Sequence, residues 1–342
     1  GAGQRCDRGV KRRFDVALLG YYGFGNLGDE LLLEAFLGLL LDAGVSRERV
    51  LVFSSNPART GATFSVPAAD RWAPGSLWSN LRLSSTLLFG GGGLFQDATS
   101  LRSVIYYSGA AFASRAARCV PWAFGQSLGP FRTETGNFLS RRAVRSMAFC
   151  GVRDTDSLDV IDRWGVPGVL SPDAVFSLMP SGDVRAKADG YLLVNLRPWP
   201  GDLNRRAAAA VARCARESGI PVVGVAMSPA DESLLQSMDG GGILKFGEIR
   251  RPSGTVEMKS LWRNARAAVG MRLHFCILSA MFGIPCTAIP YDPKVRAFAR
   301  FAGMPCFPQE PVSLSAGTMP ETLRTLGDTV RSAFLNAWRN LS

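Results

Sequence analysis

The segment FDVALLGYYGFGNLGDELLLEAFLGLLL, residues 14–41, decides the fold class of this chain. It begins with the apolar run 14–19, passes through a glycine-rich stretch at 20–30, and continues as a leucine-rich run to Leu41. A short apolar run, a glycine loop and a longer apolar run in this order are typical of the strand, loop and helix of an α/β protein. We therefore expect the chain to begin with such a unit.

The same alternation continues to the end of the chain. Further strands are predicted at 50–54, 86–89, 120–124, 149–152, 169–171, 191–196, 221–226, 267–270 and 285–289, with helical patterns between most of them. Strands that alternate with helices at this spacing form βαβ units and a parallel sheet. Turn-forming residues at 179–183 interrupt the pattern, so we predict an N-terminal domain at 14–180, a C-terminal domain at 187–310 and a helical tail at 311–342.

The composition predicts a soluble globular protein. Of the 342 residues, 47% are hydrophobic and 20% are charged. A chain of this length and hydrophobic content can form two domains, each with its own hydrophobic core. The apolar runs are shorter than the roughly 18 residues of a membrane span, and no signal-peptide pattern follows the basic N-terminus, so we expect a cytoplasmic location. The seven cysteines lack CxxC spacing and are interpreted as buried free thiols, with no metal expected.

The net charge of +11 restricts the classes of partner. Its one local concentration is a basic N-terminal cluster, which we interpret as a solvated lead-in, with adhesion to acidic lipid headgroups as the alternative. The cluster consists of Arg5, Arg8, Lys11, Arg12 and Arg13. No basic stripe interleaved with aromatic residues accompanies it, so nucleic-acid binding is not expected.

The first glycine loop predicts a ligand-facing site at the end of the first strand. Its glycines do not follow the GxGxxG spacing, and no acidic residue ends the second strand, so a dinucleotide site is disfavoured. Gly25 and Asn26 can bring backbone amides to a ligand. Asp29 is the better functional candidate because it adjoins the loop, although a role as a partner of the helix dipole is the alternative.

Three more polar stretches follow predicted strands in the first half. Four glycines at 90–93 cost backbone entropy and offer no packing, which indicates close approach of a ligand or of the opposing domain. Gln96 and Asp97 follow them. Gln126 and Arg153 come after the next two strands, and an ordinary surface ion pair is the alternative reading of Arg153.

The second half gathers cations at predicted strand ends. Arg197, Arg272 and Lys294 each follow a strand, and His274 is the chain's only histidine, at a predicted helix N-terminus. A helix N-terminus and arginine side chains both favour phosphate and carboxylate. The group predicts a pocket for a small, multiply charged anion, and a buried structural histidine is the alternative.

Taken together, seven ordered blocks resemble the polysaccharide pyruvyltransferase family over residues 14–303. The blocks are GYYGFGNLGDE at 20–30, GGGGLFQD at 90–97, GQSLGP at 125–130, VRD at 152–154, SPD at 171–173, RLH at 272–274 and YDPK at 291–294. The likeness is greatest to the bacterial subgroup that pyruvylates N-acetylmannosamine in secondary cell-wall polymers, which anchor S-layer proteins.

The resemblance implies a fold, a donor and site residues. The implied fold is α/β and GT-B-like, with two Rossmann-like domains whose parallel sheets face an interdomain cleft. The donor is phosphoenolpyruvate, with no cofactor and no metal. His274 is then a general acid or a stabiliser of the departing phosphate, and Asp29 the base. Arg272 and Arg197 hold the donor, together with Arg153 and Lys294.

The resemblance also implies an acceptor and a setting. The acceptor is a lipid-diphosphate-linked saccharide, and the enzyme would make peripheral contact with the inner membrane surface at the cytoplasmic face. The acceptor contacts are expected at Gly25, Asn26, Gly91, Gly92, Gln96, Asp97 and Gln126.

Two other functions fit the same sequence pattern. One is a GT-B glycosyltransferase that uses a nucleotide sugar, with Glu248 or Glu257 binding the ribose. The other is a non-catalytic glycan-binding or membrane-adaptor protein.

Overall fold

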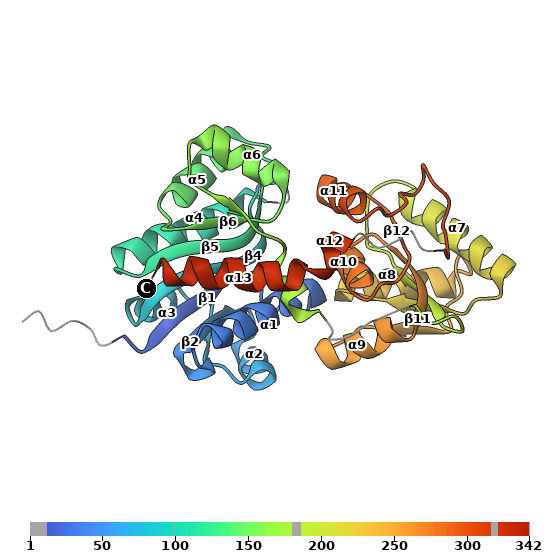
Figure 1. Ribbon diagram of the computed structural model, residues 1–342, viewed down its shortest axis with the longest axis horizontal. Helices are drawn as coiled ribbons and strands as arrows, with labels where there is room; N and C mark the ends of the chain where they lie inside the picture. Colours follow the sequence, from blue (N-terminus) through green and yellow to red (C-terminus); the bar gives the residue numbers. More distant parts are fainter. Residues whose placement is uncertain (1–11, 99, 180–185, 316–320, 342) are drawn as a thin grey trace, which may run out of the picture. The chain divides into compact units, whose positions relative to one another are not determined.

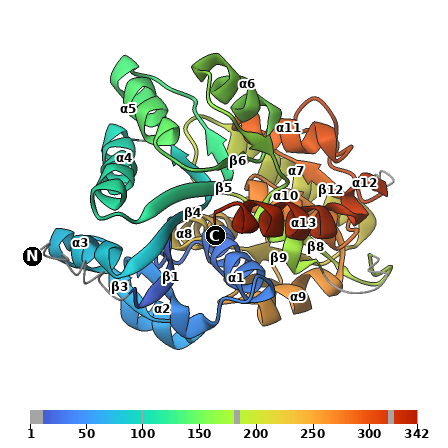
Figure 2. The same ribbon diagram turned by 60° about the vertical axis from the view of Figure 1, so that its left-hand side comes forward.

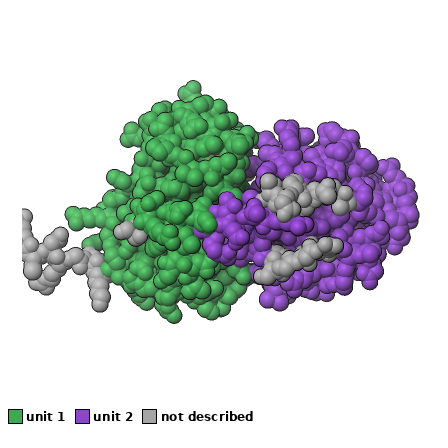
Figure 3. Space-filling view, in the orientation of Figure 1, with its two compact units in different colours: residues 1–24, 32–174, 332–342 green, residues 25–31, 175–331 purple. Residues whose placement is uncertain are grey.

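The computed structural model describes residues 12–98, 100–179, 186–315 and 321–341. The chain divides into two compact units (Figure 3). Unit 1 comprises residues 1–24, 32–174 and 332–342, and unit 2 comprises residues 25–31 and 175–331. Most of the turn-rich segment at 179–183, the residues Arg5, Arg8 and Lys11, and Cys6 lie outside the described residues.

Unit 1 contains a seven-stranded sheet in which every strand pair is parallel (Figure 1). In spatial order the strands are β3 (Ala68–Asp70), β2 (Val50–Ser54), β1 (Phe14–Leu19), β4 (Ser84–Phe95), β5 (Val120–Leu128), β6 (Cys150–Val152) and β7 (Val169–Leu170). The order reverses between β1 and β4. Open α/β sheets bind ligands at the carboxyl ends of the strands beside such a reversal.

The alternation of side chains along β5 shows how both faces of this sheet are covered. On one face, Trp122 and Phe124 contact Phe334 of α13 (Leu326–Arg339), with ring centroids 5.5 and 5.2 Å apart. Phe124 also contacts Phe36 of α1 (Leu27–Asp42). Ala123 points to the opposite face, into the core beneath four other helices of the unit (Figure 2). Those helices are α3 (Pro74–Arg82), α4 (Leu101–Ala116), α5 (Glu134–Arg145) and α6 (Thr155–Trp164).

The glycine run at 90–93 lies inside a strand, and the predicted strand 86–89 is too short. The hydroxyl of Tyr22 donates to the carbonyl of Gly90 (2.8 Å), and a methyl group on Gly90 would lie 2.1 Å from that oxygen. Gly91 and Gly92 have φ angles of +74° and +82°, just before the register of β4 against β5 shifts. At Gly90, therefore, the close approach that we expected of a ligand or of the opposing domain is made by a core side chain.

Unit 2 contains a five-stranded parallel sheet. In spatial order the strands are β10 (Glu248–Arg250), β9 (Val222–Val225), β8 (Tyr191–Asn195), β11 (Ala265–Gly270) and β12 (Cys286–Ala288). The helices α7 (Leu203–Ser218) and α8 (Pro229–Gly240) share one core, with Val194 and Val269. On the other face, Trp262 of α9 (Thr255–Arg263) contacts Phe275 of α10 (Leu273–Met281). The strand order reverses between β8 and β11.

The two parallel sheets confirm the predicted α/β class. Two α-helices and two β-strands were not predicted, α2 (Pro57–Phe64), α3, β3 and β10, and neither were the two short 3-10 helices of the chain's described part. The remaining elements are α11 (Pro293–Phe301), α12 (Glu321–Arg324) and two short 3-10 helices, η1 (Arg47–Arg49) and η2 (Ala174–Leu178). None of the helices in the described part of the chain has the length and hydropathy that a membrane crossing requires.

Candidate active site

Asn195 joins the carboxyl ends of three strands of unit 2 at the point where the strand order reverses. It is the last residue of β8 and is fully buried. Its side-chain NH2 donates to the carbonyl of Val225 in β9 (2.9 Å), and its side-chain oxygen accepts from the backbone N–H of Arg272, just after β11 (3.1 Å). These bonds fix the backbone from which Arg272 and His274 project.

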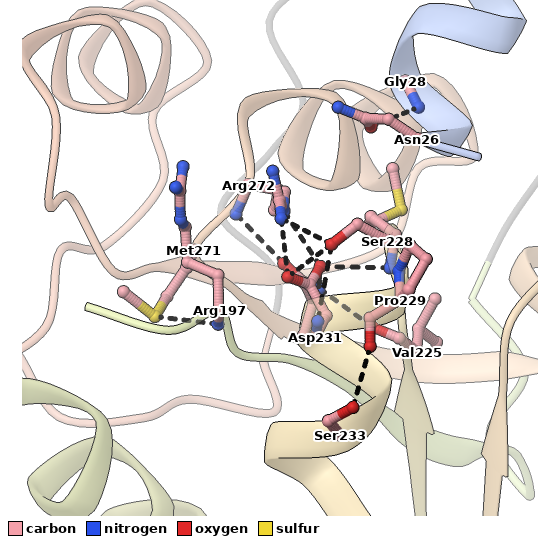
Figure 4. A network of polar contacts seen from close by, with 12 residues as sticks. Asn26, Gly28, Arg197, Val225, Ser228, Pro229, Asp231, Ser233, Met271 and Arg272 are labelled. Atoms are coloured by element: carbon pink, nitrogen blue, oxygen red, sulfur yellow. Dashed lines mark hydrogen bonds and ion pairs between the residues drawn. The ribbon is translucent and has the colours of Figure 1, made fainter. Parts of the chain in front are cut away.

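The Arg272 side chain forms a two-pronged ion pair with Asp231 (Figure 4). Nε and Nη2 of Arg272 donate to the two carboxylate oxygens at 2.9 and 2.6 Å, and Nη2 also donates to the hydroxyl of Ser228 (2.8 Å). Asp231 is 0% exposed and also accepts from the backbone N–H of Met227. Paired bonds of this kind fix the plane of a guanidinium group as well as its position.

The ion pair with Asp231 stabilises the charged form of Arg272 inside the protein. Burial by itself would lower the pKa of Arg272, but the hydrogen bonds and charge of Asp231 outweigh it, with smaller effects of Tyr291 and Asp29, and the pKa is raised. Among the described residues, none accepts a hydrogen bond from Nη1 of Arg272. One edge of the guanidinium group therefore stays available, while its charge is compensated by Asp231.

Asp231 does not stand out in the sequence as a site residue. The available signal was the spacing Ser228-x-x-Asp231 at the start of a helix, and the two side chains do bond to each other (3.0 Å). That spacing predicts a helix cap. It does not predict an arginine partner 41 residues further along the chain.

His274 lies in the first turn of α10, directly after Arg272 and Leu273, and is partly exposed. A methyl group placed on Gly28 would lie 2.3 Å from Nδ1 of His274, so the imidazole packs against a glycine backbone. Gly28 and Asp29 lie in the first turn of α1, and the segment 25–31 belongs to unit 2. The backbone N–H of Leu27 donates to the carbonyl of Met227 (2.8 Å), which anchors this segment beside the loop after β9.

The structure thus brings Asp29 into the same unit as Arg272 and His274. The charge of Asp29 contributes to the raised pKa of Arg272. Asn26 lies at the same end of α1, where its side-chain oxygen accepts from the backbone N–H of Gly28 (3.2 Å, Figure 4). The first glycine loop therefore contributes residues to the unit that contains the predicted donor site.

Arg197 follows β8 and is held by aromatic side chains. Its Nη1 donates to the hydroxyl of Tyr291 (2.6 Å), and its guanidinium carbon lies 4.6 Å from the ring centroid of Tyr291 and 5.7 Å from that of Trp199. Within the described part of the chain, no carboxylate lies at ion-pair distance from Arg197, and no hydrogen-bond acceptor faces its buried Nε. Unlike Arg272, Arg197 carries a positive charge that the described protein leaves uncompensated.

Lys294 lies in the first turn of α11. Asp292 caps this helix by accepting from the backbone N–H of Lys294 (2.8 Å), and α11 packs against α10. The bond from Arg197 to Tyr291 ties the start of this segment to the end of β8. Arg197 follows β8, Arg272 and His274 follow β11, and Lys294 follows β12, so the four residues predicted in the second half all come after the carboxyl ends of strands in one sheet.

Arg153 is internally paired within unit 1. Its Nη1 forms a nearly buried ion pair with Asp173, and its Nε donates to the hydroxyl of Ser127 (2.8 Å). The arrangement is therefore more enclosed than the ordinary surface ion pair that was the alternative reading. Gln126 is buried in β5, where its NH2 donates to the carbonyl of Phe89 (2.9 Å), and its side-chain oxygen has no partner among the described residues.

Asp97 anchors the start of α5. It accepts from the backbone N–H groups of Arg132 and Thr133 and from the Thr133 hydroxyl, and Thr133 is the N-cap of that helix. Burial by itself would raise the pKa of Asp97, but these hydrogen bonds outweigh it and the pKa is lowered. Gln96, beside it, accepts from the backbone N–H of Ala98 (3.2 Å).

We expect Asp97→Asn to lower the free energy of unfolding by about 1–3 kcal/mol at pH 7, because an amide cannot accept all of these bonds. A carboxylate with a lowered pKa stabilises the fold above its unfolded pKa of about 3.9, and this contribution is lost as the pH falls through the folded value. In urea titrations, the difference in the free energy of unfolding between wild type and Asp97→Asn should become smaller below about pH 4.

The exposed Asp159 in α6 provides the control for this prediction. Asp159→Asn should change the free energy of unfolding by less than about 0.5 kcal/mol. Equal losses for the two variants at pH 7 would show that Asp97 does not have the anchoring role.

Comparisons with known proteins agree with this architecture. A structure of UDP-GlcNAc 2-epimerase from Methanocaldococcus jannaschii is similar, with a TM-score of 0.60 and 10% identity over 92% of each chain. A putative UDP-N-acetylglucosamine 2-epimerase from Listeria monocytogenes has a TM-score of 0.59 and 12% identity, over 97% of this chain and 90% of the other. A glycosyltransferase from Rickettsia africae has a TM-score of 0.52 and 8% identity, over 97% and 95%. These likenesses support the GT-B-like fold.

Sequence comparison gives the family. No curated protein matches the chain. The profile of the family described as polysaccharide pyruvyl transferase matches residues 26–293, which is more than half of the chain. The chain therefore belongs to the polysaccharide pyruvyl transferase family, and it is a pyruvyltransferase.

Proposed function

We propose that this enzyme transfers the pyruvyl group of phosphoenolpyruvate to a sugar of a cell-wall glycan precursor, where it forms a cyclic ketal and releases phosphate. The observation that carries the choice of donor is the uncompensated charge of Arg197, held rigidly beside the strand that positions Arg272 and His274. Phosphoenolpyruvate carries a phosphate and a carboxylate on three carbons. Such a ligand requires several cationic donors at close spacing.

Arg197 and the free edge of Arg272 are the proposed donor contacts, with Lys294 nearby in α11. The N-terminus of α10 adds backbone N–H groups and the positive end of a helix dipole. Arg272 supplies directed hydrogen bonds, because Asp231 already balances its charge. Arg153 remains a further proposed contact, although its charge is paired with Asp173.

The chemistry begins with a proton added to the methylene carbon of phosphoenolpyruvate. This makes C2 an electrophile, and a sugar hydroxyl attacks it to form the first C–O bond. A second hydroxyl of the same sugar then forms the second C–O bond, while the bond between C2 and the phosphate oxygen breaks. Of the two hydroxyl protons, one balances the proton delivered to carbon and the other leaves with phosphate.

His274 and Asp29 are the proposed proton carriers. His274 donates a proton to the methylene carbon or stabilises the departing phosphate, and Asp29 accepts a proton from the acceptor hydroxyl. Asp29 and His274 both belong to unit 2, which supports this pairing. The charge of Asp29 also helps to raise the pKa of Arg272, which lies two residues before His274 in the chain. No cofactor enters the scheme.

The proposed acceptor is a lipid-diphosphate-linked saccharide that contains N-acetylmannosamine, a precursor of a secondary cell-wall polymer used in S-layer anchoring. The net charge of +11 suits an anionic diphosphate and work at the cytoplasmic face of the membrane. Gly25, Asn26, Gly91, Gly92, Gln96 and Gln126 remain the proposed acceptor contacts, and Asp97 would act through the loop that it anchors.

One assay separates this function from the two alternatives. The enzyme is incubated with an N-acetylmannosamine-containing acceptor and either phosphoenolpyruvate or a panel of nucleotide sugars, while phosphate release and the mass of the glycan are followed. We expect phosphate release and a pyruvyl mass gain with phosphoenolpyruvate alone. Turnover only with a nucleotide sugar would identify a glycosyltransferase, and glycan binding without turnover an adaptor.

A further inference from the structure

A cluster of aromatic side chains covers the carboxyl edge of the unit 1 sheet near β1 and β3. Tyr21 and Phe24 stack with ring centroids 4.0 Å apart and planes 9° from parallel. Phe24 meets Trp72 edge-on at 6.3 Å, and Trp72 lies 5.5 Å from Tyr106. Two members face outward, since Trp72 is 58% exposed and Tyr21 is 44% exposed.

The cluster lies after the carboxyl ends of β1, which borders the reversal of strand order, and of β3, the edge strand of the sheet. Tyr21 follows the end of β1 by two residues, and Trp72 follows the end of β3 by two residues. The backbone N–H of Trp72 donates to the carboxylate of Asp70 (2.8 Å), and the hydroxyl of Tyr106 donates to the carbonyl of Arg71 (2.9 Å). The backbone that carries Trp72 is thus held from both sides.

Arg71 forms a rigid base beneath these rings. It is only 3% exposed, and it donates to the carbonyl of Gly20 (2.6 Å) and to the hydroxyl of Tyr107 (3.0 Å). Its guanidinium carbon lies 4.8–5.5 Å from four ring centroids, those of Phe24, Trp72, Tyr106 and Tyr107. No carboxylate in the described ranges pairs with it. Cation–π contacts with a desolvated arginine fix the rings in place.

Trp72 and Tyr21 therefore expose large apolar ring surfaces to water, and the contacts of Arg71 hold the Trp72 ring in a fixed position. A tryptophan that served only the core would be buried, whereas Trp72 has its support below and its free surface outward. Rigid aromatic rings bind with little loss of conformational entropy. The C–H face of a pyranose ring is a flat, weakly polar surface that matches them.

We propose that Trp72 and Tyr21 form a stacking platform for a pyranose ring of the glycan acceptor. The proposal rests on the proposed function only in taking a glycan as the acceptor. The platform consists of residues that are neither among the acceptor contacts proposed above nor among the proposed donor residues of unit 2.

The test compares two tryptophans of similar exposure in the same unit. Trp72→Ala removes the platform, and Trp78→Ala, in α3 and 43% exposed, is the matched control. Binding of soluble oligosaccharides ending in N-acetylmannosamine, N-acetylglucosamine or glucose is measured by calorimetry without any phosphoenolpyruvate. We expect Trp72→Ala to weaken the binding of the preferred oligosaccharide about tenfold, Trp72→Phe to restore most of it, and Trp78→Ala to change it less than about twofold.

In turnover assays, Trp72→Ala should raise the KM for the glycan and leave the KM for phosphoenolpyruvate unchanged. Equal glycan affinities for Trp72→Ala and wild type, or no glycan binding by the wild type, would overturn the platform. The platform would also be overturned if Trp72→Ala lost only its binding to anionic lipid vesicles and kept its binding to the glycan. Trp72-dependent glycan binding without pyruvyl transfer would leave the platform standing and refute the proposed reaction.

Discussion

Replacing His274 with glutamine is expected to lower kcat for pyruvyl transfer by about 10²- to 10⁴-fold, the usual contribution of a positioned proton donor. Glutamine can still donate a hydrogen bond, but it cannot deliver a proton to carbon. The KM for phosphoenolpyruvate should change much less, because Arg197 and Arg272 keep their partners, Tyr291 and Asp231. Steady-state kinetics with a phosphate-release assay measures both parameters.

Two companion variants sharpen the His274 prediction. In His274→Ala, added imidazole should restore part of the activity, since His274 is the chain's only histidine and lies partly open. Gly28→Ala keeps the imidazole but places a methyl group 2.3 Å from Nδ1, so it should also lower kcat by displacing the ring. Wild-type kcat in His274→Gln would refute a catalytic role for this residue.

Replacing Asp231 with alanine is expected to lower the free energy of unfolding by about 3–5 kcal/mol, the usual cost of breaking a buried ion pair from one side. The change leaves the Arg272 guanidinium without a counter-charge, and it leaves the backbone N–H of Met227 without its acceptor. Urea unfolding measures the loss. The exposed pair of Asp202 and Arg206 gives the control, and Asp202→Ala should change stability by less than about 0.5 kcal/mol.

A double-mutant cycle separates the ion pair from the rest of the site. Asp231→Ala combined with Arg272→Met should cost less than the sum of the two single changes, because the double variant leaves no buried unpaired charge. Additive losses to within about 0.5 kcal/mol would show that the pair is not coupled.

The sequence predicted those parts of the fold that leave a strong local pattern. Most strands in the centres of the two sheets are continuous apolar runs, because both faces of a parallel sheet are covered by helices. The short strands β3 and β10 were missed because each is only three residues long and has no fully buried side chain, so neither forms an apolar run. The extension of β4 was missed because Gly90 owes its place to Tyr22, 68 residues earlier in the chain.

The candidate site was predictable where it depends on strand ends. Arg197, Arg272 and His274 could be located because each follows a recognisable apolar run. Their partners could not, since Asp231 and Tyr291 reach them through tertiary contacts that no spacing encodes. The same limit applies to Asp29, which local sequence assigns to the first domain, whereas its segment belongs to unit 2.

The proposed mechanism predicts which bond of the donor breaks, and this can be measured directly. Phosphoenolpyruvate is prepared with heavy oxygen in the bridge between C2 and phosphorus, and the wild-type enzyme is incubated with it and the N-acetylmannosamine-containing acceptor. Mass spectrometry then follows the glycan and the phosphate. We predict a glycan that gains one pyruvyl ketal without heavy oxygen, and an equal amount of phosphate that contains it. An unchanged glycan, or heavy oxygen retained on the organic product, would contradict pyruvyl transfer by cleavage at C2.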